Sequence, residues 1–436
     1  MKKIIAKIPK GFNEYLPKDQ LKFNNLIKTI QKTYELFGFY PIETPSLELK
    51  EILLSKGGGE TEKEVFELKK GNTDYIMPYD LTVPLARYVV EHKHEITFPF
   101  RRYQIQKVWR AEKPQRGRYR EFYQADIDIV GDNSTITDAE IPAVIYKIFK
   151  NLNMDSFIIK INNRKILNGI IDFLKLNDKS TEILRIIDKL DKVDIKQIKN
   201  LLTYIKIPKN KINFFINFIN LKGTNQEILQ KLHKLKINNN TFNLGLKELK
   251  SVYGYMNNFQ IDEKNIAIDL KIARGFDYYT GTVYETVLTQ YPKLGSICSG
   301  GRYDNLTGYF TNKIIPGVGI SIGVNRLYDF LVQKEQSKQN SDLTTKVMII
   351  CLSHNLLSEG VKISHQLRNK NIKTLLYTQN HKIQKQLKYA LKLNIPYIIF
   401  IGEDEVKKSK YTLKELSTQN QFEMYIKDII KKLSNK

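Results

Sequence analysis

Residues 108–131 read VWRAEKPQRGRYREFYQADIDIVG, and this stretch indicates what kind of fold the chain adopts. Its first half holds four arginines within eleven residues, namely Arg110, Arg116, Arg118 and Arg120. Its second half alternates polar and apolar side chains, as a strand with two unlike faces does. The order of the two halves predicts a basic turn that leads directly into a strand.

One face of this strand is mostly apolar, and the other carries Gln124, Asp126 and Asp128. Residues 101–112 alternate in the same way, with Gln104, Gln106 and Arg110 in phase. The two segments therefore form a hairpin, joined by the basic, glycine-containing loop KPQRGRY. The plain alternative is an amphipathic hairpin whose polar face is only solvated.

The residue types on this polar face favour binding over simple solvation. Arginine delivers two parallel, charge-assisted hydrogen bonds, which suit a phosphate group. Carboxylates along a strand suit an ammonium group or an imidazole N–H. Such a strand face would bind phosphate at its arginine end and a cation at its carboxylate end. An amino acid and a nucleotide bound side by side require this combination.

Size and charge narrow the class of protein. A chain of 436 residues predicts two or three domains. The formal net charge of +24 is high for a soluble protein, and a charge of this sign favours a nucleic-acid partner. The alternative explanation of this charge is a general bias of the genome toward lysine.

The two cysteines, Cys298 and Cys351, form no C-x-x-C motif, and the six histidines show no metal spacing. This argues against a zinc site or a disulfide framework and is typical of a reducing cytoplasm. The basic start is interrupted by Lys7, Pro9 and Lys10, unlike a signal peptide. No apolar run reaches the roughly 18 residues of a membrane span.

The chain divides by composition. Periodicity predicts helices over 18–37 and 137–150. A segment poor in glycine, from about 160 to 260, reads as a helical insertion, and strand patterns return from 266. A polar linker over 333–345 precedes alternating strand and helix patterns, which predict a small α/β domain with a largely parallel sheet.

Three further stretches hold candidate site residues. In MPYDLTVPLARY (77–88), Asp80 and Thr82 share a face if the segment is extended, although a turn acid with a capping threonine explains them equally well. In ARGFDYYTG (273–281), Arg274 leaves an apolar run before a glycine, and Tyr278 and Tyr279 follow. A surface arginine with core tyrosines is the alternative there.

The third stretch is PGVGISIGVNRL (316–327). Gly317, Gly319, Ser321 and Gly323 share one face, which is almost bare, so a flat ring could lie on it. A helix that starts near Val324 places Arg326 where its guanidinium can stack on the ring. Close packing of a helix on the strand also requires small residues and is the alternative.

These stretches together resemble the bacterial-type histidyl-tRNA synthetases, a family of class II aminoacyl-tRNA synthetases. Residues 34–48, 107–131 and 316–331 are similar to class II motifs 1, 2 and 3, and ARGFDYYTG and SGGRYDNL to signatures of this family. The resemblance covers nearly the whole chain. It implies an α+β catalytic domain over 1–332, with an antiparallel sheet flanked by helices. It also implies an α/β anticodon-binding domain over 346–436, and a homodimer.

The resemblance also implies residue roles. Arg110, Arg274 and Arg326 are expected to be catalytic. Expected histidine ligands are Asp80, Leu81, Thr82, Arg110, Gln124, Asp128, Arg274, Tyr278 and Tyr279. Expected ATP ligands are Arg110, Glu112, Arg118 and Arg326, with Mg²⁺ arriving on ATP rather than at a resident metal site. Lys113, Gln115 and Arg116 are expected to contact the acceptor end of tRNA.

The implied reaction joins L-histidine to ATP, releases pyrophosphate, and transfers histidine from the adenylate to the 3′ end of tRNA-His in the cytoplasm. Positioning and electrostatics would suffice for it. Rival interpretations are the non-catalytic regulatory subunit of ATP phosphoribosyltransferase, a synthetase for threonine, proline or glycine, and a plain RNA-binding protein. Asp128 and the two tyrosines favour histidine. Asn325 and Pro78 depart from the family pattern, where glutamate and arginine are usual.

Overall fold

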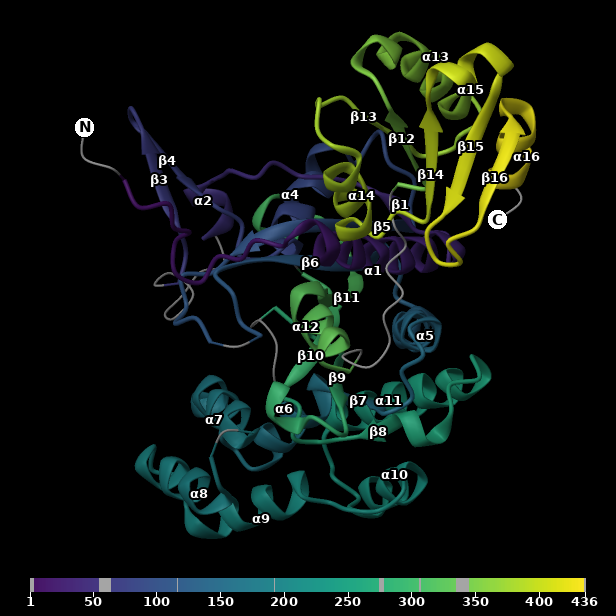
Figure 1. Ribbon diagram of the computed structural model, residues 1–436. Helices are drawn as coiled ribbons and strands as arrows, with labels where there is room; N and C mark the ends of the chain where they lie inside the picture. The colour runs from purple at the N-terminus through teal and green to yellow at the C-terminus, as the bar shows by residue number, and fades with distance from the viewer. Residues whose placement is uncertain are drawn as a thin grey trace. The chain divides into compact units, whose positions relative to one another are not determined.

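The computed structural model describes residues 4–54, 64–115, 117–191, 193–273, 278–305, 307–334 and 345–434. The chain divides into two compact units, Met1–Lys338 and Gln339–Lys436. Figure 1 shows the strands and helices of both units. Among the described residues, no helix has the length and apolar character needed to cross a membrane.

The first unit is organised around an eight-stranded sheet with the order β1-β5-β6-β11-β10-β9-β7-β8. Neighbouring strands are antiparallel except at the two edges, where β1 pairs with β5 and β7 with β8 in parallel. The predicted antiparallel sheet is therefore confirmed for the central strands. The strands are β1 (Tyr40–Pro41), β5 (Phe100–Trp109), β6 (Glu121–Val130), β7 (Phe157–Asn163), β8 (Ile266–Ile268), β9 (Thr282–Leu288), β10 (Ser296–Tyr303) and β11 (Gly317–Gly323).

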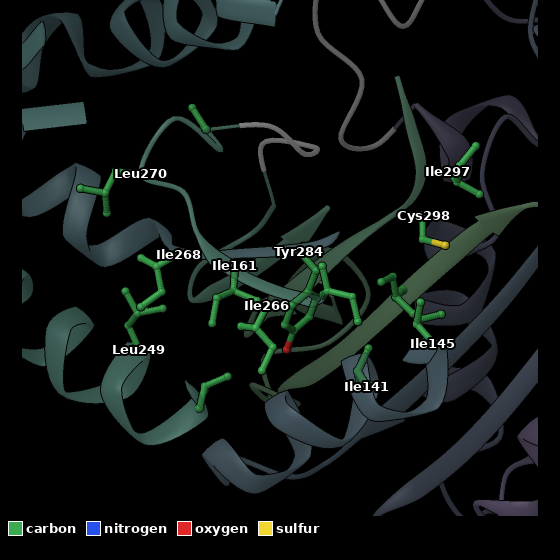
Figure 2. Packing of buried hydrophobic residues seen from close by; sticks show 14 of the residues in the cluster. Ile141, Ile145, Ile161, Leu249, Ile266, Ile268, Leu270, Tyr284, Ile297 and Cys298 are labelled. Atoms are coloured by element: carbon green, nitrogen blue, oxygen red, sulfur yellow. The ribbon is translucent and has the colours of Figure 1, made fainter. Parts of the chain in front are cut away.

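Long helices bury the apolar face of this sheet. α1 (Pro17–Leu36) and α5 (Thr135–Asn151) form close to where the periodicity predicts them, and α11 (Asn240–Asn258) packs beside α5. Ser134 caps α5 by accepting a hydrogen bond from the amide of Ile136. Figure 2 shows Ile141 and Ile145 of α5 in one core with Ile161 of β7 and Leu249 of α11.

The helical segment predicted from about 160 begins after β7, which continues as a strand to Asn163. Its buried side chains join the same hydrophobic cluster as the sheet, so the segment packs as part of the first unit. Its helices are α6 (Arg164–Phe173), α7 (Ser180–Ile187), α8 (Ile195–Tyr204), α9 (Lys209–Ile219), α10 (Asn225–Lys234) and α11. Other helices and strands that the structure describes in this unit are α2 (Lys50–Leu53), α4 (Thr82–Glu91), α12 (Val324–Lys334) and a small sheet of β2 (Glu48–Leu49), β4 (Thr73–Ile76) and β3 (Glu67–Lys70), in addition to short 3-10 turns.

The second unit is a five-stranded sheet with the order β13-β12-β14-β15-β16. The prediction of a largely parallel sheet is wrong for half of it, because β14, β15 and β16 pair antiparallel. Only eight residues separate β14 from β15, too few for a parallel crossover. The elements are β12 (Val347–Cys351), α13 (Leu357–Arg368), β13 (Thr374–Tyr377), α14 (Ile383–Lys392), β14 (Tyr397–Ile401), α15 (Glu403–Lys408), β15 (Lys410–Glu415), β16 (Gln421–Tyr425) and α16 (Ile426–Ser434).

Strand register aligns the polar residues of the first unit in rows across the sheet. Asp128 of β6 lies opposite Arg102 of β5 on one side and Gly319 of β11 on the other. Gly301 of β10 continues this row. The next row on the same face holds Gln104, Asp126, Ser321 and Ser299.

The bare face of β11 serves two different purposes. A Cβ atom at Gly319 would overlap the carboxylate of Asp128, and one at Gly317 would overlap the ring of Tyr303. These two glycines therefore make room for side chains of neighbouring strands. Gly323, at the other end, is open: the nearest atom to a Cβ there is 3.7 Å away.

We expect Gly319→Ala to destabilise the first unit, because the added methyl group must displace a buried carboxylate. Overpacking of this kind typically costs about 1–3 kcal/mol. Urea unfolding followed by circular dichroism measures the change. Gly323→Ala on the same strand is the matched control and should leave the midpoint nearly unchanged; equal midpoints for the two variants would contradict the packing argument.

Candidate active site

Two adjoining cavities lie on the polar face of the sheet. The larger has a volume of about 290 Å³ and the smaller about 60 Å³. A ligand in one cavity can contact a ligand in the other, because five of the described residues line both: Arg110, Gln124, Tyr279, Ser299 and Ser321.

Arg110 lies where the two cavities meet. Its Nε donates to the carbonyl of Tyr79 at 3.1 Å, and its Nη2 donates to Oε1 of Gln124 at 3.0 Å. Its guanidinium also lies 5.3 Å from the ring centroid of Phe122. These contacts hold the positive charge at the boundary between the cavities.

The larger cavity is lined by two further guanidiniums. Arg326, in the first turn of α12, donates from Nε to the carbonyl of Gly117 at 3.2 Å and from Nη1 to the carbonyl of Ser296. Arg118 and Gln115 exchange backbone hydrogen bonds of 2.8 and 3.1 Å, which close a tight turn at Gly117. The positive φ of 74° at Gly117 favours glycine there. A cavity with three arginines suits a polyanion.

The smaller cavity has an incompletely bonded carboxylate in its wall. Oδ1 of Asp80 accepts from the amide of Val83 at 3.2 Å, just before α4. Oδ2 is buried and accepts no hydrogen bond from any described residue. Burial raises the pKa of Asp80 to about 6. A buried acceptor of this kind suits a ligand with charged N–H donors.

Asp128 forms the floor of the smaller cavity. Its Oδ2 lies 2.6 Å from Nη2 of Arg102, and its Oδ1 accepts from the hydroxyl of Tyr303 at 2.6 Å. Burial raises the pKa of Asp128 to about 7, against the opposing effects of Arg102 and Tyr303. The carboxylate is therefore oriented at both oxygens before any ligand arrives.

A polar link joins this floor to Arg110. Nε2 of Gln124 donates to Ser321 at 2.8 Å and to Asp126 at 3.3 Å, while its Oε1 accepts from Arg110. Burial raises the pKa of Asp126 as well. The amide of Gln124 is thus held in one orientation, with its oxygen toward the guanidinium.

Tyrosines form the remaining wall. The rings of Tyr278 and Tyr279 meet edge to face at 4.9 Å between centroids, and Tyr278 meets Tyr303 in the same way at 6.2 Å. Burial raises the pKa of all three phenols, so they stay neutral and keep their hydroxyl protons.

Most of the residues singled out in the sequence converge on these cavities. Those lining the smaller one are Asp80, Thr82, Arg110, Gln124, Asp128, Tyr278 and Tyr279. Those lining the larger one are Arg110, Glu112, Arg118, Gln124, Tyr279 and Arg326. Arg116 and Arg274 lie outside the described residues.

Three predicted residues are placed elsewhere. Leu81 is fully buried and is not among the described residues that line either cavity. Lys113 and Gln115 are exposed, and they too are not among the described residues that line either cavity. Thr82 reaches the smaller cavity from the first turn of α4, not from the extended segment considered as one possibility, because Asp80 turns the chain into a helix.

Two residues that sequence reasoning missed touch the floor directly, Arg102 and Tyr303. Both carried a usable signal. Arg102 is in phase with Gln104 and Gln106 on β5, and Tyr303 is in phase with Gly301 on β10. An arginine in phase with the polar face of a predicted strand requires a partner of opposite charge once it is buried, but the identity of that partner depends on how the strands pair.

The two departures from the family pattern have ordinary structural roles here. Oδ1 of Asn325 accepts from the amide of Tyr123 at 2.7 Å, and its Nδ2 donates to Tyr15 at 3.0 Å. The carbonyl of Pro78 accepts from the amide of Trp109 at 2.8 Å. Asn325 also lines the larger cavity.

Comparison with known proteins shows the family to which the chain belongs. The family model for histidyl-tRNA synthetases matches residues 11–327, and the anticodon binding domain model matches residues 346–436. Histidine–tRNA ligase from Clostridium tetani is 48% identical over the full length of both chains. The enzyme of that name from Finegoldia magna is 43% identical and covers 97% of this chain and 98% of its own.

Solved structures give the same result. Histidyl-tRNA synthetase from Nostoc sp. PCC 7120 superposes with a TM-score of 0.87 at 36% identity and covers 99% of this chain and all of its own. A Bacillus halodurans protein described as an ATP phosphoribosyltransferase regulatory subunit/histidyl-tRNA synthetase has a TM-score of 0.76 at 19% identity, over 92% of this chain and 99% of its own, which shows a shared fold alone. With a matching family model over most of its length and relatives at this identity, the chain belongs to the histidyl-tRNA synthetase family.

Proposed function

We propose that this protein activates L-histidine with ATP and transfers it to the 3′ end of tRNA-His. One observation carries the proposal: a cavity lined by three guanidiniums adjoins a smaller, acid-floored cavity, and Arg110 belongs to both. A nucleotide in the first and an amino acid in the second would meet at that arginine.

The amino acid fits the smaller cavity in one orientation. Its ammonium group would donate to Oδ2 of Asp80, beside Thr82 and Gln124, and so supply the missing partner of a buried acceptor. Its imidazole N–H would donate to Asp128. A side chain without an N–H at this place would leave that carboxylate unpaired, which supports selectivity for histidine.

ATP fits the larger cavity. Arg110 would bind the α-phosphate, Arg118 the outer phosphates, and Arg326 would cover the adenine. Mg²⁺ would arrive on the phosphates and reduce their charge. Glu112 and Glu285, which line this cavity among the described residues, would help to hold that ion.

The chemistry requires positioning more than reactive side chains. A carboxylate oxygen of histidine attacks the α-phosphorus, the bond to the bridging oxygen of the β-phosphate breaks, and pyrophosphate leaves. The terminal ribose hydroxyl of tRNA then attacks the adenylate carbonyl carbon, and AMP leaves. Arg110, together with Arg274 by family resemblance, would stabilise the charge that develops in the first step.

The tRNA would contact both units. We propose residues 1–332, with the helical insertion, as the catalytic domain, and 346–436 as the anticodon-binding domain after a linker at 333–345. Lys113, Gln115 and Arg116 would meet the acceptor end. Exposed Leu36, at the end of α1, and exposed Tyr40, in the edge strand β1, support a homodimer formed through residues 34–48. The site of action would be the cytoplasm.

Exchange of labelled pyrophosphate into ATP, measured with each of the twenty amino acids in turn, tests the proposal. Histidine should support exchange, and the other amino acids should not, because they lack an N–H donor placed for Asp128. Exchange with another amino acid and none with histidine would contradict the assignment.

Asp80→Asn should raise the KM for histidine by roughly tenfold or more, since the amide removes the negative charge that would pair with the ammonium group. The KM for ATP should change little. Asp304→Asn is the control, because Asp304 is half-buried, bonds to Thr280, and is not among the described residues lining either cavity. An unchanged histidine KM in Asp80→Asn would remove this residue from the amino-acid site.

Removal of residues 346–436 should leave histidine-dependent pyrophosphate exchange largely intact while tRNA charging falls sharply. The reason is that both cavities are built from the first unit alone. Exchange and charging are measured on the same preparation, and circular dichroism checks its folding. Full charging by the truncated chain would refute the anticodon role of the second unit.

A further inference from the structure

Arg102 is a fully buried arginine near the start of β5. Register places it directly across from Asp128, and its Nη2 lies 2.6 Å from Oδ2 of that residue. Its Nη1 also donates to Gln104 at 3.2 Å, and its Nη2 to the carbonyl of Leu81 at 3.4 Å. The guanidinium is thus held on several sides.

Stability alone is a poor reason for this ion pair. Removing two charges from water is costly, and a buried pair is often no more stabilising than apolar residues of the same volume. Asp128 lines the smaller cavity, whereas Arg102 is not among the described residues lining either one. Any effect of Arg102 on a ligand is therefore indirect, and Asp128 is the lining residue with which it forms an ion pair.

We propose that Arg102 is a positioning residue for amino-acid recognition, which fixes the orientation and the negative charge of the Asp128 carboxylate. This inference rests on the proposed function. Arg102 holds Oδ2 while the hydroxyl of Tyr303 holds Oδ1, so the carboxylate cannot rotate. Each oxygen can accept more than one hydrogen bond, which leaves acceptor capacity facing the cavity.

The surrounding charges make Arg102 necessary for that role. Asp126, on the same strand, and Asp80, before α4, both oppose ionisation of Asp128, as does burial itself. Arg102 and the hydroxyl of Tyr303 act in the opposite direction. The neighbouring phenol of Tyr279 stays neutral.

Loss of Arg102 therefore raises the pKa of Asp128 further. Because the pKa of Asp128 is already about 7 with Arg102 present, a larger fraction of the carboxyl groups then carries a proton at neutral pH and presents an O–H in place of an acceptor. It also loses the contact that orients Oδ2, so the ring N–H of histidine meets a misplaced and uncharged partner.

The test is pyrophosphate exchange by Arg102→Met and Arg102→Lys, with KM determined separately for histidine and ATP. The pH runs from about 7, the pKa of Asp128 with Arg102 present, up to about 8.5. Arg102→Met should raise the histidine KM on the order of tenfold or more and leave the ATP KM nearly unchanged. The ratio of variant to wild-type histidine KM should fall as pH rises, because alkali restores the charge of Asp128. Free histidine titrates equally in both assays, so dividing the variant KM by the wild-type KM removes the effect of that titration. Arg102→Lys keeps the charge and should give a smaller rise with a flat ratio.

Arg101→Met is the matched control. Arg101 is the next residue on β5, faces the opposite side of the sheet, and forms its own half-buried ion pair with Glu140. Its loss should change neither histidine KM nor its pH dependence. A second comparison uses the Asp128→Asn background, in which adding Arg102→Met should change the histidine KM less than about threefold, because the coupled charge is already absent.

The second comparison also covers a folding failure of Arg102→Met, since the double variant removes both charges of the Arg102–Asp128 pair and so leaves neither partner of that pair buried alone. The proposal is overturned by a histidine KM within about twofold of wild type across this pH range, or by equal rises in both KM values with a flat pH ratio. If pyrophosphate exchange by the wild-type protein did not depend on histidine, the proposed function itself would be refuted instead.

Discussion

The register of β5, β6 and β11 is the constraint on which the site depends. Side chains alternate with a period of two, so a slip of one residue would carry Asp128 into the apolar core and Ile127 onto the polar face. Burial of the apolar face against α1 and α5 opposes any such slip. The small residue at Gly319 then matches the carboxylate opposite it.

That register gathers like charges in a small volume. Asp80, Asp126 and Asp128 are all buried beside the smaller cavity, and among the described residues the positive charges of Arg102 and Arg110 act on them. Burial raises the pKa of each carboxyl group. Burial of three carboxyl groups without enough positive partners costs free energy, and a bound cation would offset that cost. An ammonium group and a ring N–H donor are ligands that remove the cost, which agrees with an amino-acid site for histidine.

Local patterns in the sequence anticipated the parts of the fold that are local in origin. The hairpin, the start of α12 at Val324 and the helices α1 and α5 follow from alternation, periodicity and breaking residues. The sheet of the second unit was mispredicted, since alternation of strands and helices does not reveal that the connection between β14 and β15 is too short for a parallel crossover. Asp80 was correctly suspected of a turn role, and its local bond to Val83 confirms that role while the other oxygen stays open to the cavity.

The sequence by itself determined which chemical groups are present and which strand face carries them, because both follow from residue identity and a period of two. It therefore sufficed to single out Arg110, Gln124 and Asp128 and to recognise the family. Only the tertiary structure decided that Arg102 and Tyr303 clamp Asp128 from neighbouring strands, and that Gly317 and Gly319 accommodate side chains. Those contacts join residues far apart in the chain, and their pairing depends on strand order and register, which no local pattern encodes.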